Sequence, residues 1–459
     1  MAGMTGSLTS GSLTGHMVRL MAPMILGNIL QQLYNTVDVA VIGRCCGESE
    51  FAAVGVAGSV MNLFLFAVAG ACSGIAVLFA QLYGAEDLNR LRQEHFLALS
   101  AGLVFSLALA GIGISLTSPL LRLLRTPEEL VALAHRYLSV ILLALPATFL
   151  YNFYSALFRS VGRTAVPLLI LAAATGLNLG LDLLFLSVLG LGVAGAALAT
   201  AAAQFCSALL CLLYLCLRTP SLCFRRGDCK MNRALLVKTL RFGAVTGFHQ
   251  CALYLGKLLV QGAVNTGGTA LITAFTSSVR IEGFANSFGD SGAVATSIIV
   301  AQNYGAGKQA RLRRTFQVSL LLLSALGLLM GLLMFAFAAP LTLLVTGGTQ
   351  AAVLEQAVRY LRIVSVCYVL CFTGNTFAGY FDGTGRVAIP FAGAVSHITM
   401  RVILSWLLVP HFQLAAVAAA TGIGWVWVNL LWWRIDRASA SRQAQPEPLI
   451  GRCSSHDFQ

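Results

Sequence analysis

Long runs of apolar residues, separated by short polar segments, dominate the chain from about residue 17 to residue 435. The twelve runs are centred near residues 30, 66, 105, 145, 177, 205, 250, 286, 326, 368, 398 and 423. A helix needs about 20 apolar residues to cross the hydrocarbon core of a bilayer, and these runs are long enough. They are apolar on all faces rather than alternating, which favours helices over the strands of a membrane barrel. The pattern therefore predicts an all-α polytopic membrane protein with twelve transmembrane helices.

Composition and charge support a membrane location. Hydrophobic residues make up 58% of the chain and charged residues 10%, whereas a soluble domain carries about 25% charged residues. The net charge is +13, but the basic residues gather in alternate loops, for example at 90–92 and 225–226. The intervening loops at 188–192 and 264–269 contain no lysine or arginine. This positive-inside pattern predicts a multi-pass protein of the cytoplasmic (inner) membrane with both termini cytoplasmic, in contact with lipids and not with nucleic acid.

Two motifs occur twice. Q-L-Y-G-A at 81–85 returns as Q-N-Y-G-A at 302–306, and F-R-S-V-G-R-T-A-V-P at 158–167 returns as F-D-G-T-G-R-V-A-I-P at 381–390. We expect the glycines to end helices and the prolines to begin the next ones. Internal repeats in a polytopic protein are typical of transporters, whose substrate path lies between the repeats. Six spans in each half predict two six-helix lobes related by a pseudo-two-fold axis along the membrane normal.

The predicted organisation has five parts. They are a flexible cytoplasmic N-terminus (1–16), an N-terminal lobe (17–217), a basic cytoplasmic inter-lobe loop (218–235), a C-terminal lobe (236–435) and a disordered cytoplasmic tail (436–459). Two lobes around a central cleft can open that cleft to one side of the membrane and then to the other. We expect such a protein to work as a monomer.

Motifs for other functions are missing from the sequence. G-A-G-K at 305–308 lacks the preceding glycine and the following serine or threonine of a nucleotide-binding loop. Neither H-E-x-x-H nor G-x-S-x-G, the signatures of zinc proteases and serine hydrolases, occurs. We therefore expect no enzyme activity and no cofactor, and transport energy must come from an ion gradient or from the substrate's own gradient.

The stretch P-M-I-L-G-N-I-L-Q-Q-L-Y-N-T-V-D-V-A-V-I-G-R at 23–44 resembles the first helix of the multidrug and toxic compound extrusion (MATE) family, bacterial type. N-L-G-L-D at 178–182 resembles the family's fifth helix, and A-A-V-G at 52–55 and the two Q-x-Y-G-A motifs extend the match. The resemblance implies a secondary active antiporter that exports amphipathic, often cationic, drugs or toxic metabolites in exchange for H⁺ or Na⁺. A flippase of lipid-linked saccharide in a related fold is the alternative.

Polar side chains inside the predicted spans of the N-terminal lobe suggest an ion site. Asp38 lies in the first span, Asn152 in the fourth, Asn178 and Asp182 one turn apart in the fifth, and Thr200 in the sixth. Such groups are costly in the membrane and usually line a transport path. Their oxygens would bind Na⁺, with Asp38 and Asp182 as the metal ligands, or share a proton. The resemblance implies the same role for Asp38, Asn178 and Asp182. The alternative is that these groups only hydrogen-bond helices together.

The second lobe does not copy this pattern. Its candidate residues are Glu282 in the eighth span, Lys257 in the seventh and Arg401 in the eleventh. Glu282 is a candidate proton site or an anion that attracts cationic substrate. Alternatively, it forms an internal ion pair with Lys257 or Arg401. A flippase would need a strongly basic cavity for a pyrophosphate, whereas the spans carry few cations beyond Lys257, Arg280 and Arg401.

Overall fold

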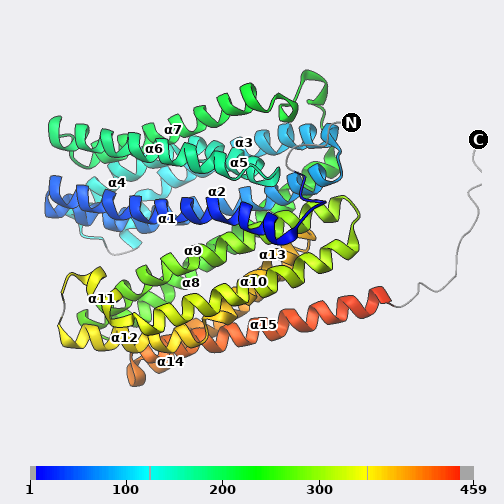
Figure 1. The fold of residues 1–459 in the computed structure, drawn as a ribbon. Helices are drawn as coiled ribbons and strands as arrows, with labels where there is room; N and C mark the ends of the chain where they lie inside the picture. The colour runs from blue at the N-terminus through cyan, green and yellow to red at the C-terminus, as the bar shows by residue number, and fades with distance from the viewer. Residues whose placement is uncertain (1–6, 124–125, 349, 445–459) are drawn as a thin grey trace, which may run out of the picture.

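The computed structural model describes residues 7–123, 126–348 and 350–444, and within them every regular element is helical. Figure 1 shows two adjacent stacks of long helices, α1 to α7 (blue to green) in one lobe and α8 to α15 (green to red) in the other. Each lobe contains six long helical segments, some of them bent or interrupted. The twelve segments coincide with the twelve predicted apolar runs, so the predicted all-α architecture of two six-helix lobes is confirmed.

The two lobes repeat the same order of elements. The N-terminal lobe contains α1 (Leu13–Cys45), α2 (Glu48–Gly84), α3 (Leu88–Leu123), α4 (Glu128–Leu143), α5 (Leu145–Ser160), α6 (Ala165–Asp182), the π-helical turn η1 (Leu183–Val188) and α7 (Gly192–Arg218). The C-terminal lobe contains α8 (Arg233–Asn265), α9 (Thr269–Gly305), α10 (Gln309–Ala336), α11 (Ala338–Thr346), α12 (Ala351–Val366), α13 (Tyr368–Gly383), α14 (Ala388–Phe412) and α15 (Leu414–Ala444). The pair α4 and α5 is bent by 44°, and its counterpart α12 and α13 by 52°.

Not every segment is apolar enough to cross a membrane when it is judged alone. Eight helices meet that condition by length and composition, and the two bent pairs raise the number to ten. The remaining segments are α8 and α9. Helix α9 carries Arg280, Glu282 and Asp290, and α8 carries Lys257. These two helices also pack against α2 of the other lobe, where polar groups can be sheltered from lipid.

Close approach of α2 and α8 joins the lobes. A Cβ atom added to Gly70 of α2 would lie 2.6 Å from the carbonyl oxygen of Thr246, and one added to Gly74 would lie 2.5 Å from that of Phe242. Both distances are shorter than a carbon–oxygen contact permits, so only glycine fits at these two positions. Small residues let helix backbones come together in this way, and dispersion contacts then hold helices that the lipid does not drive together.

Helix α1 is shared between the two hydrophobic cores. Its first half contributes Leu13, Met17 and Leu20 to the core of the C-terminal lobe. Its second half reaches the core of the N-terminal lobe, where Ile42 is buried. The predicted lobe boundary at residue 17 is therefore not the packing boundary, because α1 crosses from one lobe to the other along its length.

The predicted flexible N-terminus is wrong for residues 7–16. Leu8 is buried, and its N–H donates a hydrogen bond of 2.9 Å to Oε1 of Gln302. The guanidinium of Arg311 donates to the carbonyls of Ser10 and Gly11, both at 2.9 Å. The polar composition did not indicate this order, because backbone groups make several of these contacts. Residues 1–6 of the predicted segment lie outside the described residues.

The predicted disordered tail is wrong for residues 436–444, because α15 continues to Ala444. Asp436 is buried in this extension and forms an ion pair of 2.7 Å with Arg313 at the start of α10. The ion pair attaches the end of α15 to the rest of its lobe. The remainder of the predicted tail, 445–459, lies outside the described residues.

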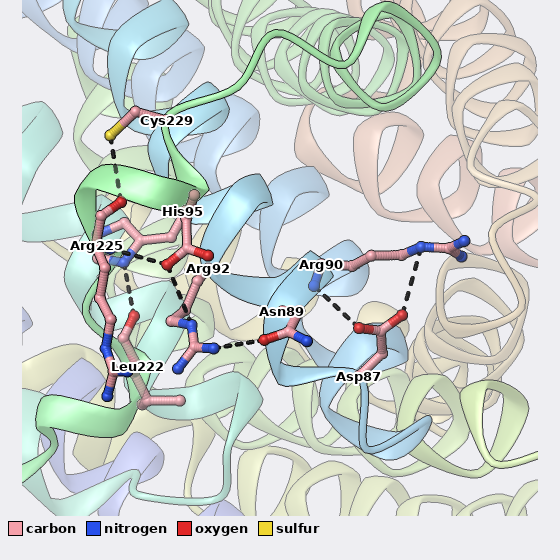
Figure 2. Close-up of polar contacts among 9 residues, drawn as sticks. Asp87, Asn89, Arg90, Arg92, His95, Leu222, Arg225 and Cys229 are labelled. Carbon is pink, nitrogen blue, oxygen red and sulfur yellow. Dashed lines mark hydrogen bonds and ion pairs between the residues drawn. The ribbon is translucent and has the colours of Figure 1, made fainter.

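The basic loop between the lobes is docked on the N-terminal lobe rather than extended. Figure 2 shows the loop and the beginning of α3, with Arg92 between Asn89 and the loop residues. Arg92 pairs with Asp228 at 3.3 Å, and Nδ1 of His95 lies 2.9 Å from the carbonyl oxygen of Leu222. Two short 3₁₀ turns, η2 (Pro220–Leu222) and η3 (Arg226–Asp228), shape the loop. These contacts anchor the loop to α3.

Candidate functional site

The N-terminal lobe brings together three of the predicted ion-site residues. Asn178 and Asp182 are almost completely buried at the end of α6, and Asp38 is partly buried in α1. The backbone changes from α-helix to π-helix directly after Asp182. Such π-helical turns are rare and often occur at functional sites. The carboxyl groups of Asp38 and Asp182 face each other within interaction range.

The polar atoms of this cluster have few protein partners. Within the described residues, Oδ1 of Asp38, both carboxyl oxygens of Asp182 and both amide atoms of Asn178 are buried without a hydrogen bond. A buried charge without a partner is strongly unfavourable, and two facing carboxylates also repel each other. The arrangement therefore suits a small cation or a proton between the two carboxyl groups. The described residues contain no group of three or more His, Cys, Asp or Glu side chains that could hold a metal ion, so an ion here would have to use amide and hydroxyl oxygens as well.

Two tyrosines that were not among the predicted site residues complete the N-terminal cluster. Tyr34 lies one turn before Asp38 in α1, interacts with both carboxyl groups and contacts the hydroxyl of Thr200 in α7. Tyr137 of α4 also lies within range of both carboxyl groups. The four-residue spacing of Tyr34 and Asp38 was a usable signal, because it places both on one face of a helix. Nothing in the sequence distinguishes Tyr137 from other aromatic residues of the spans.

The remaining N-terminal candidates behave differently from each other. Thr200 is in contact with Tyr34 and so lies beside the cluster, and its role in an ion site stays a prediction. Asn152 turns back to its own helix, where its amide donates a hydrogen bond of 2.9 Å to the carbonyl of Thr148. Within the described residues, no hydrogen bond connects Asn152 with Asp38 or Asp182, so its place in the ion site stays a prediction.

The C-terminal lobe holds a second cluster around Glu282. This carboxyl group interacts with Tyr360 of α12 and is within electrostatic range of Arg401 and Lys257. Within the described residues, the ion pairs shorter than 4.0 Å do not include Glu282. The two cations therefore act on its charge from a distance, and the alternative of an internal ion pair with Lys257 or Arg401 is not seen within 4.0 Å.

Asp290 extends this second cluster along α9. It lies within range of Lys257 and interacts with Asn375 of α13. The hydroxyl of Tyr368 donates a hydrogen bond of 2.7 Å to Oδ1 of Asn286, one turn from Glu282. The two tyrosines and Asn375 were not among the predicted site residues, since their contacts come from helices far apart in the chain.

The repeated motifs meet at one end of the molecule and form an inter-lobe seam. Gln81 of α2 donates a hydrogen bond of 3.1 Å to the carbonyl of Gly383, and Gln302 of α9 donates one of 2.7 Å to that of Ser160. The carbonyl of Gln302 also lies against Gly84, and that of Gln81 against Gly305, closer than any Cβ atom would allow. Helices α2 and α9 end at Gly84 and Gly305, but the C-cap residues are Ala85 and Ala306 rather than the glycines predicted as caps. The motifs therefore close the two lobes against each other.

The chain is similar to the members of one protein family. The family model MatE matches the chain twice, over residues 23–184 and 246–407. The probable multidrug resistance protein YoeA of Bacillus subtilis is 27% identical over 412 residues, covering 85% of this chain and 89% of YoeA. The probable multidrug resistance protein NorM of Thermotoga maritima is 24% identical over 422 residues, covering 89% and 88%.

Solved structures show the same fold. A multidrug resistance MATE family transporter of the MOP superfamily in an outward-facing conformation superposes with a TM-score of 0.87, at 23% identity, over 97% of this chain and 100% of that one. A MATE structure described as the bent conformation gives a TM-score of 0.86 at 24% identity, over 97% and 99%. The two family matches correspond to the two lobes of the structure.

Proposed function

We propose, from the premise that this chain belongs to the MATE family of multidrug efflux transporters, that it is a secondary active antiporter. It exports amphipathic small molecules, cationic ones included, in exchange for H⁺ or Na⁺. The observation that carries the proposal is the facing pair Asp38 and Asp182 with its unpartnered oxygens. The relatives named as multidrug resistance proteins support small-molecule substrates.

The ion acts on the facing carboxyl groups. Burial disfavours two adjacent negative charges, so binding a proton or Na⁺ between Asp38 and Asp182 removes repulsion and lets α1 and α6 approach. Because α1 also packs in the core of the C-terminal lobe, a change at Asp38 is transmitted to the other lobe. One charge moving through 100 mV supplies about 2.3 kcal/mol, whereas a tenfold gradient of a neutral compound requires about 1.4 kcal/mol. One ion per cycle therefore suffices for export against a tens-fold gradient.

Alternating access explains exchange rather than co-transport. The inter-lobe seam closes one end of the molecule, and basic residues gather at that same end, among them Arg90, Lys308 and Arg311. The positive-inside pattern assigns this end to the cytoplasm, with both termini there. The structure then corresponds to a state closed to the cytoplasm, and the cycle requires the seam to separate when substrate is loaded.

The flippase alternative receives less support. A pyrophosphate needs several free cations, but Lys257 and Arg401 each lie within range of Glu282, and Lys257 also of Asp290. Lys257 and Arg401 are therefore already compensated by carboxylates.

Efflux measurements test the proposal. Ethidium export is measured in vesicles under a proton gradient and a sodium gradient imposed separately, for the wild type and for Asp38→Asn. We expect export under one gradient and its loss in the variant. Glu355→Gln, which removes an exposed carboxylate on α12, is the matched control and keeps export. Export by Asp38→Asn at the wild-type rate under the same gradient contradicts the role of Asp38. Absence of ethidium export by folded wild-type protein contradicts the multidrug proposal for this probe.

A further inference from the structure

The end of the C-terminal lobe that is remote from the inter-lobe seam contains a cavity of about 540 Å³. It lies between the first three turns of α9, the end of α11 and the start of α12. Its size is in the range of sites for small organic molecules. One wall is polar, with Thr273, Thr276 and Arg280, and another is apolar, with Val345 and Val353. Neither the ion site nor the cluster around Glu282 includes these residues.

Arg280 is the charged residue of the lining, and its charge is not compensated. Within the described residues, no ion pair or hydrogen bond involves its guanidinium, and no carboxyl group of the Glu282 cluster is in range of it. Lys257 and Arg401, by contrast, share the carboxylates of that cluster. Arg280 therefore differs from Lys257 and Arg401, because no carboxylate of that cluster is in range of its guanidinium, which is free to bind a ligand.

The depth of Arg280 makes this free charge informative. It lies eleven residues after the start of α9 at Thr269, which is about 16 Å along the helix axis. An unpaired cation inside a span is costly, and where one is found it usually faces a water-filled cavity on a transport path. The exposed position of Arg280 in the cavity fits this rule.

Hydroxyl groups beside Arg280 add hydrogen-bonding capacity. Thr273 donates to the carbonyl of Thr269 at 2.9 Å, and Ser277 donates to that of Ala274 at 2.9 Å, so both can only accept a further bond. Thr276 makes no hydrogen bond to any described residue and is exposed. Its hydroxyl is free to donate, one turn from the guanidinium on the same helix.

We propose that this cavity is an anion-binding subsite, in which Arg280 and Thr276 hold the carboxylate, phosphate or sulfonate group of an amphipathic compound. The guanidinium presents two parallel donors to such a group, and the Thr276 hydroxyl supplies another. The apolar body of the compound rests on Val345 and Val353. The inference rests on the proposed export function for the direction of travel, and it adds organic anions and zwitterions to the substrate class. The same chemistry would hold the headgroup of an anionic lipid.

Equilibrium binding tests this subsite without any gradient or transport. The protein is placed in nanodiscs of phosphatidylcholine, and the fluorescence of dansylglycine, an anion, is compared with that of a dansyl probe carrying a trimethylammonium group. We expect Arg280→Gln to weaken dansylglycine binding about tenfold or more, because a hydrogen bond to a charged group is lost, and to leave the cationic probe unaffected. Arg280→Lys should retain part of the affinity, and Thr276→Val should weaken binding about threefold.

Arg359→Gln is the matched control, since it removes an exposed arginine of α12 outside the cavity with the same change in net charge. Equal dansylglycine affinity in Arg280→Gln and the wild type overturns the proposal, as does equal weakening by Arg359→Gln. Loss of both probes in Arg280→Gln and Arg280→Lys shows a general role in folding and also overturns it. Nanodiscs that contain phosphatidylglycerol show whether the subsite holds a lipid headgroup or a free organic anion. If the headgroup occupies the subsite, phosphatidylglycerol weakens dansylglycine binding to the wild type but not to Arg280→Gln. Because no ion gradient is used, these outcomes are independent of the efflux test.

Discussion

Gln81 and Gln302 occupy equivalent positions in the two repeats, and each side-chain amide donates a hydrogen bond to a backbone carbonyl across the boundary between the lobes. Gln81 reaches Gly383 and Gln302 reaches Ser160, which are themselves equivalent positions of the second repeated motif. The occurrence of both motifs in each half therefore produces a reciprocal lock. In the alternating-access cycle that we propose, this lock stabilises the state in which the seam is closed and opens in the other state.

We predict that the double variant Gln81→Leu, Gln302→Leu weakens closure at the seam. Each buried hydrogen bond contributes about 1 kcal/mol, so loss of two shifts the open-to-closed ratio by roughly tenfold or more. Hydrogen exchange of the backbone around 302–306 measures the effect and should become faster. Gln309→Leu, a change at an exposed glutamine of α10, is the control and should leave exchange as in the wild type. Unchanged exchange in the double variant would show that the glycine contacts alone hold the seam.

Gly84→Ala and Gly305→Ala should each force the lobes apart. The added methyl group would overlap the carbonyl of Gln302 or of Gln81, and a backbone atom at that position cannot move aside alone. We expect a loss of stability of about 1–3 kcal/mol, typical of overpacking, seen as a lower Tm, together with reduced efflux. Gly58→Ala in α2 is the control, because a Cβ there meets no atom within 4 Å. It should be neutral or slightly stabilising, and an equal drop in Tm for Gly58→Ala would remove the seam as the cause.

Asp38 and Asp182 should act as one unit. If both carboxyl groups hold the same ion, Asp38→Asn and Asp182→Asn each abolish ion-driven efflux, and the double variant is no worse than either single one. Efflux rates under the effective gradient, compared across this cycle of variants, measure the coupling. Additive losses from two partially active variants would instead indicate two independent ion sites.

Arg311 should order the segment that precedes α1. Its guanidinium donates to three backbone carbonyls, those of Leu8, Ser10 and Gly11. Arg311→Ala therefore removes charge-assisted bonds that hold this segment to α10, and hydrogen exchange of residues 8–11 should accelerate at least tenfold. Arg314→Ala is the control, because this neighbouring arginine is exposed and makes no hydrogen bond or ion pair within the described residues. Similar exchange in the two variants would mean that other contacts order the segment.

Part of the candidate site was predictable from the sequence because polar and charged side chains inside an apolar run are conspicuous. Asp38, Asn178 and Asp182 were identified in this way, and the structure brings them together. Tyr34 and Tyr137 could not be selected with the same certainty, since tyrosines are common in membrane spans. Their role depends on α1, α4 and α6 meeting at one point, which pattern analysis of single helices does not show.

The sequence by itself determined the class of protein, the twelve spans and the division into two lobes, because the bilayer imposes a fixed length of apolar residues and a repeat is visible in the letters. Tertiary structure alone decided that α1 belongs to both cores, that residues 7–16 are ordered against α9 and α10, and that α15 extends past residue 436. It also decided that the repeated Q-x-Y-G-A motifs face each other, and that Arg280, unlike Lys257 and Arg401, lacks a carboxylate partner. The physical reason is that these features are contacts between helices distant in the chain. The hydrophobic pattern of a span indicates that it lies in lipid, but it does not indicate which other helices pack against it.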